Sequence, residues 1–229
     1  MSQMKKSEIT ERMNKVTSIS AAKAKEKEFL ASEEIVQELH ACDVMYTSLK
    51  SQLANMIETH TKEQKDTLTI APLFLGLIKS AAEAYKEFEK AKFLLAKQLP
   101  VDAGYEITDW SCDYESKRVT YEEVKTISKK EKVITIPEAV WNYVWDTQLY
   151  HQVVADVITW LTDSYANAKK DTITTSAVFK GMLALKARLF DDYDHAKAEM
   201  YASQVPTEDK AKYTNWSLSF DSGVLTLTE

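Results

Sequence analysis

Glycine and proline are scarce in this chain, with four of each among 229 residues. Glycine supplies the positive-φ backbone that phosphate-cradling loops and the many turns of a β-sandwich need. The sequence therefore argues against a glycine-rich nucleotide site and against an all-β fold rich in loops. A chain of this length with 45% hydrophobic residues can still bury a core without disulfides or metal ions.

Arginine is rare as well, since only Arg12, Arg118 and Arg188 occur among the 29 basic residues, and the formal net charge is −6. Nucleic-acid-binding surfaces usually carry a basic face on which arginine side chains contact phosphate and guanine. Neither feature is visible here, so the sequence predicts no nucleic-acid partner.

Cysteine and long apolar runs are the remaining shortages. Cys42 and Cys112 are 70 positions apart, a spacing that favours neither a disulfide framework nor a zinc site. The longest apolar run, Ile70 to Ile78, is about half the length that spans a bilayer, and the N-terminus lacks the apolar core of a signal peptide. We expect a cytoplasmic protein that does not enter a membrane.

What the chain does contain is a tandem duplication. The sequence Asp-Thr-Leu-Thr at 66–69 recurs as Asp-Thr-Ile-Thr at 171–174, 105 positions later. Ordered matches of this kind across a whole unit indicate a repeated architecture. Other matches pair Phe74 with Phe179, Gly76 with Gly181, Ala91 with Ala196 and, after one inserted residue, Pro100 with Pro206, Trp110 with Trp216 and Thr120 with Thr226.

Each copy begins with two helical patterns. Ser32 followed by Glu33, and Pro137 followed by Glu138, are typical helix starts. Apolar residues then recur at helical spacing along one stripe, and Pro100 and Pro206 follow the second helix of each copy. The stripe residues of the first helix are Ile35, Leu39, Cys42, Tyr46, Leu49, Leu53 and Met56, and those of its counterpart are Val140, Val144, Val154, Ile158, Leu161 and Tyr165.

Each copy ends in a pattern of period two. In the second copy Trp216, Leu218 and Phe220 alternate with polar residues, and the turn sequence at 221–223 contains glycine. A glycine-containing turn between two alternating runs is a strong hairpin signal. The repeated unit is therefore predicted to be helix, helix, β-hairpin.

These patterns predict an α+β fold, predominantly helical, in which four long helices form a pseudo-symmetric bundle with β-hairpins. Residues 26–123 form the first repeat and 131–229 the second, with a linker at 124–130 and an N-terminal segment, 1–25, outside the repeat. We expect the two copies to be related by an approximate two-fold axis. Trp110 and Trp216 should then occupy equivalent buried positions.

The sequence offers little for catalysis or metal binding. None of the four histidines has a histidine at the equivalent position of the other copy, and the Glu-x-x-His pattern of helical di-metal sites does not occur. Asp192-x-x-His195 has a suitable spacing but lies in a charged run that reads as a solvated helix face. We expect no catalytic residues, no cofactor and no bound metal ion.

Two features suggest partner binding. Trp141 and Trp160 replace Val36 and Asn55 of the first copy, and surplus aromatic residues often mark interfaces. The final hairpin strands, Val119 to Tyr121 and Leu225 to Leu227, would each leave an open edge that invites pairing with the other hairpin or with a second chain. The candidate partner-binding residues are Trp141, Trp160, Leu225 and Leu227.

The sequence thus favours a non-enzymatic intracellular scaffold for protein interaction or assembly, for instance a phage structural, adaptor or host-docking component. Its partner would be another protein or further copies of itself. The alternative is a small-molecule-binding protein or enzyme with an asymmetric site between the helical pairs. A deep pocket with convergent polar groups would favour this alternative, and a filled core with exposed aromatic residues would favour the scaffold.

Overall fold

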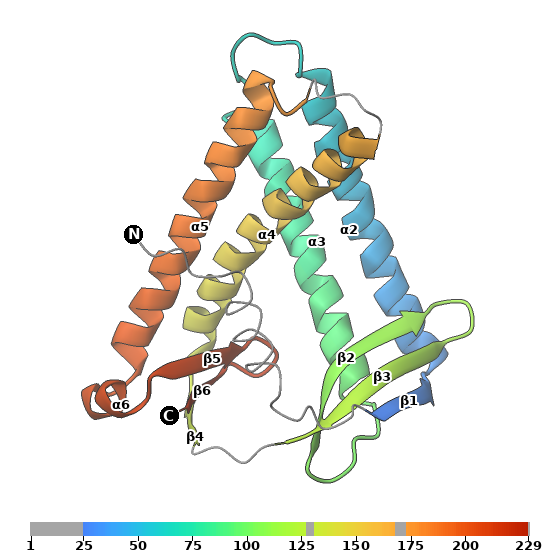
Figure 1. Ribbon diagram of the computed structural model, residues 1–229, viewed down its shortest axis with the longest axis vertical. Helices are drawn as coiled ribbons and strands as arrows, with labels where there is room; N and C mark the ends of the chain where they lie inside the picture. Colours follow the sequence, from blue (N-terminus) through green and yellow to red (C-terminus); the bar gives the residue numbers. More distant parts are fainter. Residues whose placement is uncertain (1–24, 127–130, 168–172, 229) are drawn as a thin grey trace, which may run out of the picture. The chain divides into compact units, whose positions relative to one another are not determined.

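The computed structural model describes residues 25–126, 131–167 and 173–228 (Figure 1). In this part of the chain the fold is α+β and mostly helical, and two helix pairs are each followed by an antiparallel hairpin, as predicted. The first copy contains β1 (Lys25–Leu30), α2 (Glu33–Thr59), α3 (Pro72–Ala96), β2 (Tyr105–Asp113) and β3 (Arg118–Lys125). The second contains β4 (Glu131–Thr135), α4 (Glu138–Asn167), α5 (Ala177–Gln204), α6 (Thr207–Lys212), β5 (Asn215–Ser219) and β6 (Val224–Thr228).

Each hairpin is joined by a third strand that comes before the helices of its copy. The sheets have the orders β1-β3-β2 and β4-β6-β5, so the last strand of each hairpin lies in the centre of its sheet. The expectation of open edges at Val119–Tyr121 and Leu225–Leu227 is therefore wrong, because β1 and β4 pair with them. Neither hairpin needs the other hairpin or a second chain to cover these strands.

The two sheets repeat the same register. Lys27 and Trp110 flank Tyr121 in the first sheet, and Lys132 and Trp216 flank Leu227 in the second. The two tryptophans therefore occupy equivalent positions, as expected. Both are half-buried rather than fully buried, because each lies on the outer strand of its three-stranded sheet.

The hairpin turns are equivalent in backbone geometry although their sequences differ. Lys117 has φ 58° and Gly223 has φ 65°. Each carbonyl accepts a hydrogen bond from the backbone N–H that follows the first strand of its copy, Ala31 at 3.0 Å and Ile136 at 2.8 Å. The fold thus requires a left-handed residue at this position in both copies. Beyond the first turn, β3 extends through Lys125 into the segment that was expected to be a linker.

The chain divides into two compact units that do not coincide with the two copies. Residues 1–33 and 98–128 form one unit, whose described part contains the first sheet. Residues 34–97 and 129–229 form the other, with the long helices and the second sheet. In the first unit, the Lys27 ammonium lies 2.9 Å from the buried carboxylate of Glu123 and 3.1 Å from Asp102.

The four long helices in the second unit share one apolar core. The helix starts agree with the predictions at Glu33 and Glu138, and the Ser176 side chain caps α5 by accepting a hydrogen bond from the Phe179 N–H. No helix in the described ranges is long and apolar enough to cross a membrane. Core side chains include Leu53 and Ile57 of α2, Phe74 and Ile78 of α3, Val153 and Leu161 of α4, and Val178 and Met182 of α5.

The equivalent turns give a matched pair of substitutions. We expect Gly223→Ala to lower the free energy of unfolding by about 2 kcal/mol, because left-handed backbone costs an L-residue about 1–2 kcal/mol. A Cβ there would also clash with Nε1 of Trp141. Urea denaturation followed by circular dichroism measures this loss.

Lys117→Gly is the control. The substitution removes the strain of a left-handed lysine, but it adds the backbone entropy of glycine and removes an exposed ion pair with Glu33. Because these contributions offset one another, we expect the free energy of unfolding to change by less than about 1 kcal/mol. Equal destabilisation by the two substitutions would contradict the equivalence of the turns.

Candidate interaction surfaces

Trp141 and Trp160, the two tryptophans that have no aromatic counterpart in the first copy, lie in different environments. Trp141 is half-buried, and its ring packs 5.9 Å from that of Trp145, between centroids, and against Gly223. Packing within the second unit therefore accounts for Trp141. Trp160 of α4 is 39% exposed, which leaves it available to a partner.

Leu225 and Leu227 lie inside the protein. Both side chains are fully buried on β6, in a cluster that also includes Val144, Met200 and Tyr213. With their strand paired on both sides, these leucines stabilise the second sheet against α4 and α5. The fold offers neither their side chains nor their strand edge to a partner.

A polar network joins α2, α3 and α4. The Tyr46 hydroxyl donates a 2.6 Å hydrogen bond to Asp156, which also accepts one of 2.7 Å from Gln152. The Tyr46 ring stacks on Tyr85, with centroids 4.5 Å apart, and Lys86 forms a 2.8 Å ion pair with Asp146. Hydrogen bonds with defined partners fix the position of α2 and α3 along α4.

The two tyrosines of this network belong to the first copy, whereas its carboxylates, Asp146 and Asp156, belong to the second. The equivalents of Tyr46 and Tyr85 are His151 and Phe190, whose rings contact each other with centroids 5.4 Å apart. Burial is the main cause of a raised pKa at Tyr46, and the hydrogen bond to Asp156 is the second cause. Burial is also the main cause of the raised pKa of Tyr85, and the charge of Glu89 is the second. Burial, followed by the charge of Lys186, lowers the pKa of His151.

Beside this network, α2 and α3 form an open apolar groove of about 610 Å³. Met45 of α2 is 60% exposed there although it is apolar. The opposite wall, on α3, has the small side chains Ser80 and Ala84. The complete lining is Met45, Leu49, Ser80, Glu83, Ala84, Lys86 and Glu87.

The second copy has larger apolar side chains at the equivalent positions, and its two helices, α4 and α5, pack against each other. The equivalents of Ser80 and Ala84 are Leu185 and Leu189, and Leu185 is buried. The repeat therefore accepts leucine where the groove has small residues. Sequence reasoning missed the groove, although the exchange of small residues for leucines at equivalent positions is a signal that could have found it.

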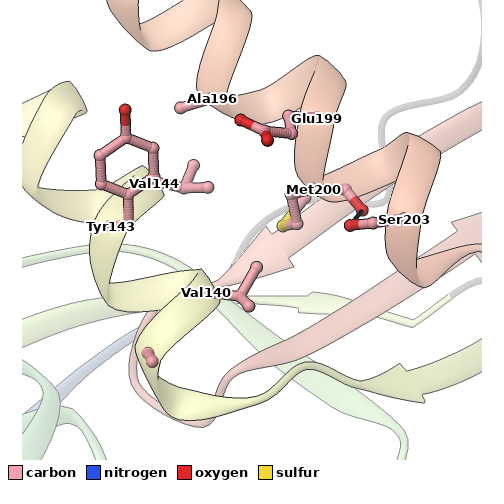
Figure 2. A pocket seen from close by; sticks show the side chains of 8 residues that line it. Val140, Tyr143, Val144, Ala196, Glu199, Met200 and Ser203 are labelled. Carbon is pink, nitrogen blue, oxygen red and sulfur yellow. Dashed lines mark hydrogen bonds between the residues drawn. The ribbon is translucent and has the colours of Figure 1, made fainter.

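A second hollow lies between α4 and α5 (Figure 2), with a volume of about 360 Å³. Figure 2 shows Val140, Val144 and Met200 between the two helices and the carboxylate of Glu199 at the α5 side. Tyr143, Ala196, Ser203 and Ala139 complete the lining. The hollow combines an apolar floor with three polar groups, those of Tyr143, Glu199 and Ser203.

The outer face of the first sheet is acidic. Glu26, Glu122 and Asp109 stand directly opposite one another on three adjacent strands. Their equivalents in the second sheet are Glu131, Thr228 and Asn215, so only one carboxylate remains there. Adjacent like charges across strands are unfavourable, and the second sheet forms without them.

The fold defines a tandem-repeat α+β protein in which each copy contributes two helices to a common core. Within the described ranges, no group of three or more histidine, cysteine, aspartate or glutamate side chains is placed to hold a metal ion. Comparisons with family models, with curated proteins and with solved structures find no match to this chain.

The buried tyrosine provides a test that depends on pH. We expect Tyr46→Phe to lower the free energy of unfolding by about 1.5–3 kcal/mol near pH 8, because the Asp156 carboxylate loses a hydrogen-bond donor. Tyrosine titrates near pH 10 in the unfolded chain, and its folded pKa is higher. The contribution of Tyr46 is therefore complete below about pH 10 and is lost as the pH rises above that value.

Urea titrations between pH 8 and pH 11 should show the wild-type and Tyr46→Phe curves approaching each other above about pH 10, by about 1.4 kcal/mol per pH unit. Parallel curves over this range would show that the Tyr46 hydroxyl is not buried against Asp156.

Proposed function

We propose that this protein is a non-enzymatic interaction scaffold whose groove between α2 and α3 binds an apolar helix from a protein partner. The observation that supports this most strongly is an exposed methionine in an apolar groove whose opposite wall has small residues where the second copy has leucines. Large apolar side chains facing solvent in a groove mark interaction sites in soluble proteins. Amphipathic helices bind such grooves, and methionine adapts to different apolar surfaces.

The rim of the groove suggests the chemistry of the partner. Glu83 and Glu87 lie along one side and are each paired with an exposed lysine of the same helix, Lys79 and Lys90. Exposed pairs of this kind contribute little and can exchange partners. A helix with lysine or arginine beside its apolar face would therefore complement the groove. Trp160, exposed on α4, is proposed as a further contact residue.

Two substitutions test the groove directly. Met45→Glu places a charge among its apolar residues, and Ser80→Leu fills it with the side chain that the second copy has at that position. Leu94→Glu is the matched control, since Leu94 is exposed on α3 outside the groove and its equivalent is Glu199. Affinity capture from cells that produce the protein, with quantitative mass spectrometry, compares the three variants with wild type.

We expect at least one protein to be captured by wild type and Leu94→Glu and lost with Met45→Glu and Ser80→Leu. Calorimetry with that purified protein should then give a Kd raised at least about tenfold by either groove substitution, a loss of about 1.4 kcal/mol or more. If no captured protein depends on the groove residues, the proposed function is wrong.

The hollow between α4 and α5 favours a second function, small-molecule binding. Its volume lies within the range of small-ligand pockets, and Tyr143, Glu199 and Ser203 could orient a ligand over the apolar floor. A thermal-shift screen of metabolites against wild type and Ala196→Leu separates the possibilities. A stabilising compound whose effect disappears in Ala196→Leu would favour this function over the scaffold.

A further inference from the structure

One side of α5 carries an apolar ridge that the described part of the protein covers only in part. Leu183, Ala187 and Phe190 recur at helical spacing, on a flank of α5 beside the face that carries the core residues Met182 and Leu185. Leu183 is 46% exposed and Phe190 is 45% exposed. Figure 1 shows α5 at the edge of the set of four long helices, with α4 as its neighbour.

The same ridge is buried in the first copy. The equivalents of Leu183, Ala187 and Phe190 on α3 are Ile78, Ala82 and Tyr85. Ile78 is 4% exposed and Ala82 is 3% exposed, in a helix that packs against α4. A ridge of this pattern, with a small residue between two large ones, therefore accepts a helix in this fold. The exposed ridge on α5 retains the pattern without the covering helix.

One way to cover the ridge is to repeat the internal contact head to tail, with α2 of a second chain in the place of α4. The buried residues Trp145, Leu149 and Val153 form the matching row on α4. Their equivalents on α2 are His40, Val44 and Ser48, all exposed and mostly polar. The α2 surface thus lacks the apolar row that this contact needs.

A second α5 helix fits the ridge better, because the ridge is complementary to itself. Lys180 lies seven positions before Ala187 and Asp194 lies seven positions after it, on the same side of the helix. In an antiparallel pair centred on Ala187, each Lys180 would face Asp194 of the other chain, and each Leu183 would lie near the other Phe190. The small alanine at the centre permits a close approach of the two backbones.

The groups on the ridge are also held in place. The Phe190 ring packs against His151 of α4, and the Asp194 carboxylate forms a 2.6 Å ion pair with Lys197 while remaining half exposed. Side chains fixed before association lose less conformational freedom on binding.

We propose that two copies of this chain form a two-fold symmetric dimer through antiparallel α5 helices centred on Ala187. Such a contact is closed, since the same patch is used on both chains, and it does not propagate into filaments. The dimer leaves the groove between α2 and α3 free and so extends the proposed function without depending on it.

Sedimentation equilibrium of the full-length chain over a range of concentrations tests the dimer. We expect wild type to show a monomer–dimer equilibrium and Phe190→Glu to raise its Kd at least about tenfold. Val44→Glu, an equivalent change from apolar to acid on α2, should leave the dimer unchanged. A wild type that stays monomeric throughout overturns the proposal, whatever else covers the ridge, and weakening by Val44→Glu indicates the head-to-tail contact instead.

Charge reversal tests the antiparallel register. Lys180→Asp or Asp194→Lys alone should weaken the dimer, and the two together in one chain should restore it, because each pair is then reversed. Failure of the double variant to recover affinity would contradict the register.

A cross-link tests whether the two-fold axis of the dimer passes beside Ala187. In a Cys42→Ser, Cys112→Ser background, Ala187→Cys should form a disulfide-linked dimer on mild oxidation. An otherwise identical chain with cysteine at Val44 should remain monomeric in non-reducing gels. Absence of the Ala187→Cys cross-link in a chain that still dimerises would place the axis elsewhere. None of these measurements uses a groove variant, so they test the dimer independently of the partner binding proposed for the groove.

Discussion

The apolar core shared by the four long helices is the constraint on which the rest of the structure depends. A pair of helices in water cannot bury its own apolar stripe, and packing rather than helix propensity provides most helical stability in proteins. Here Leu53, Ile78, Val153 and Met182 come from four different helices and from both copies. The hydrogen bond from Tyr46 to Asp156 crosses the same boundary and fixes the position of α2 along α4. The helix pairs are thus parts of one folding unit.

The duplication also serves as an internal comparison. Where both copies keep a feature, such as the left-handed turn residue or the strand register, the fold requires it. Where the copies differ, the fold accepts either residue, and the residue at that position can serve a role other than folding. Ser80 lines the groove where the second copy has the buried Leu185, and Leu183 lies exposed on the ridge where the first copy has the buried Ile78. Both candidate surfaces are therefore departures from the common plan of the repeat.

Much of the fold could be predicted from the sequence, because it follows from local patterns. The ordered matches located the copies, the 3.6-residue spacing located the helices, and the alternating runs before and after Gly223 located a hairpin. The first strand of each copy was missed, because Lys25–Leu30 and Glu131–Thr135 are short and rich in charged residues. Their pairing depends on hairpins nearly a hundred residues later in the chain, which no local pattern reveals.

The candidate sites were harder to predict. Trp141 looked like a surplus aromatic residue, and its packing on Gly223 became visible only in three dimensions. Leu225 and Leu227 lie in the last strand of a hairpin, and its pairing with β4, far earlier in the chain, leaves no local sequence signal. The groove and the ridge depend on which side of a helix meets a neighbour. Helical periodicity gives the apolar side of a helix but does not say which neighbour covers it.

Native-state hydrogen exchange tests the shared core most directly. If the helices fold as one unit, the slowest amides at Leu53, Ile78, Val153 and Met182 should exchange with the same opening free energy, equal to that of global unfolding. Two classes of protection, with α2 and α3 opening at a lower free energy than α4 and α5, would show that the copies fold separately and would contradict this account.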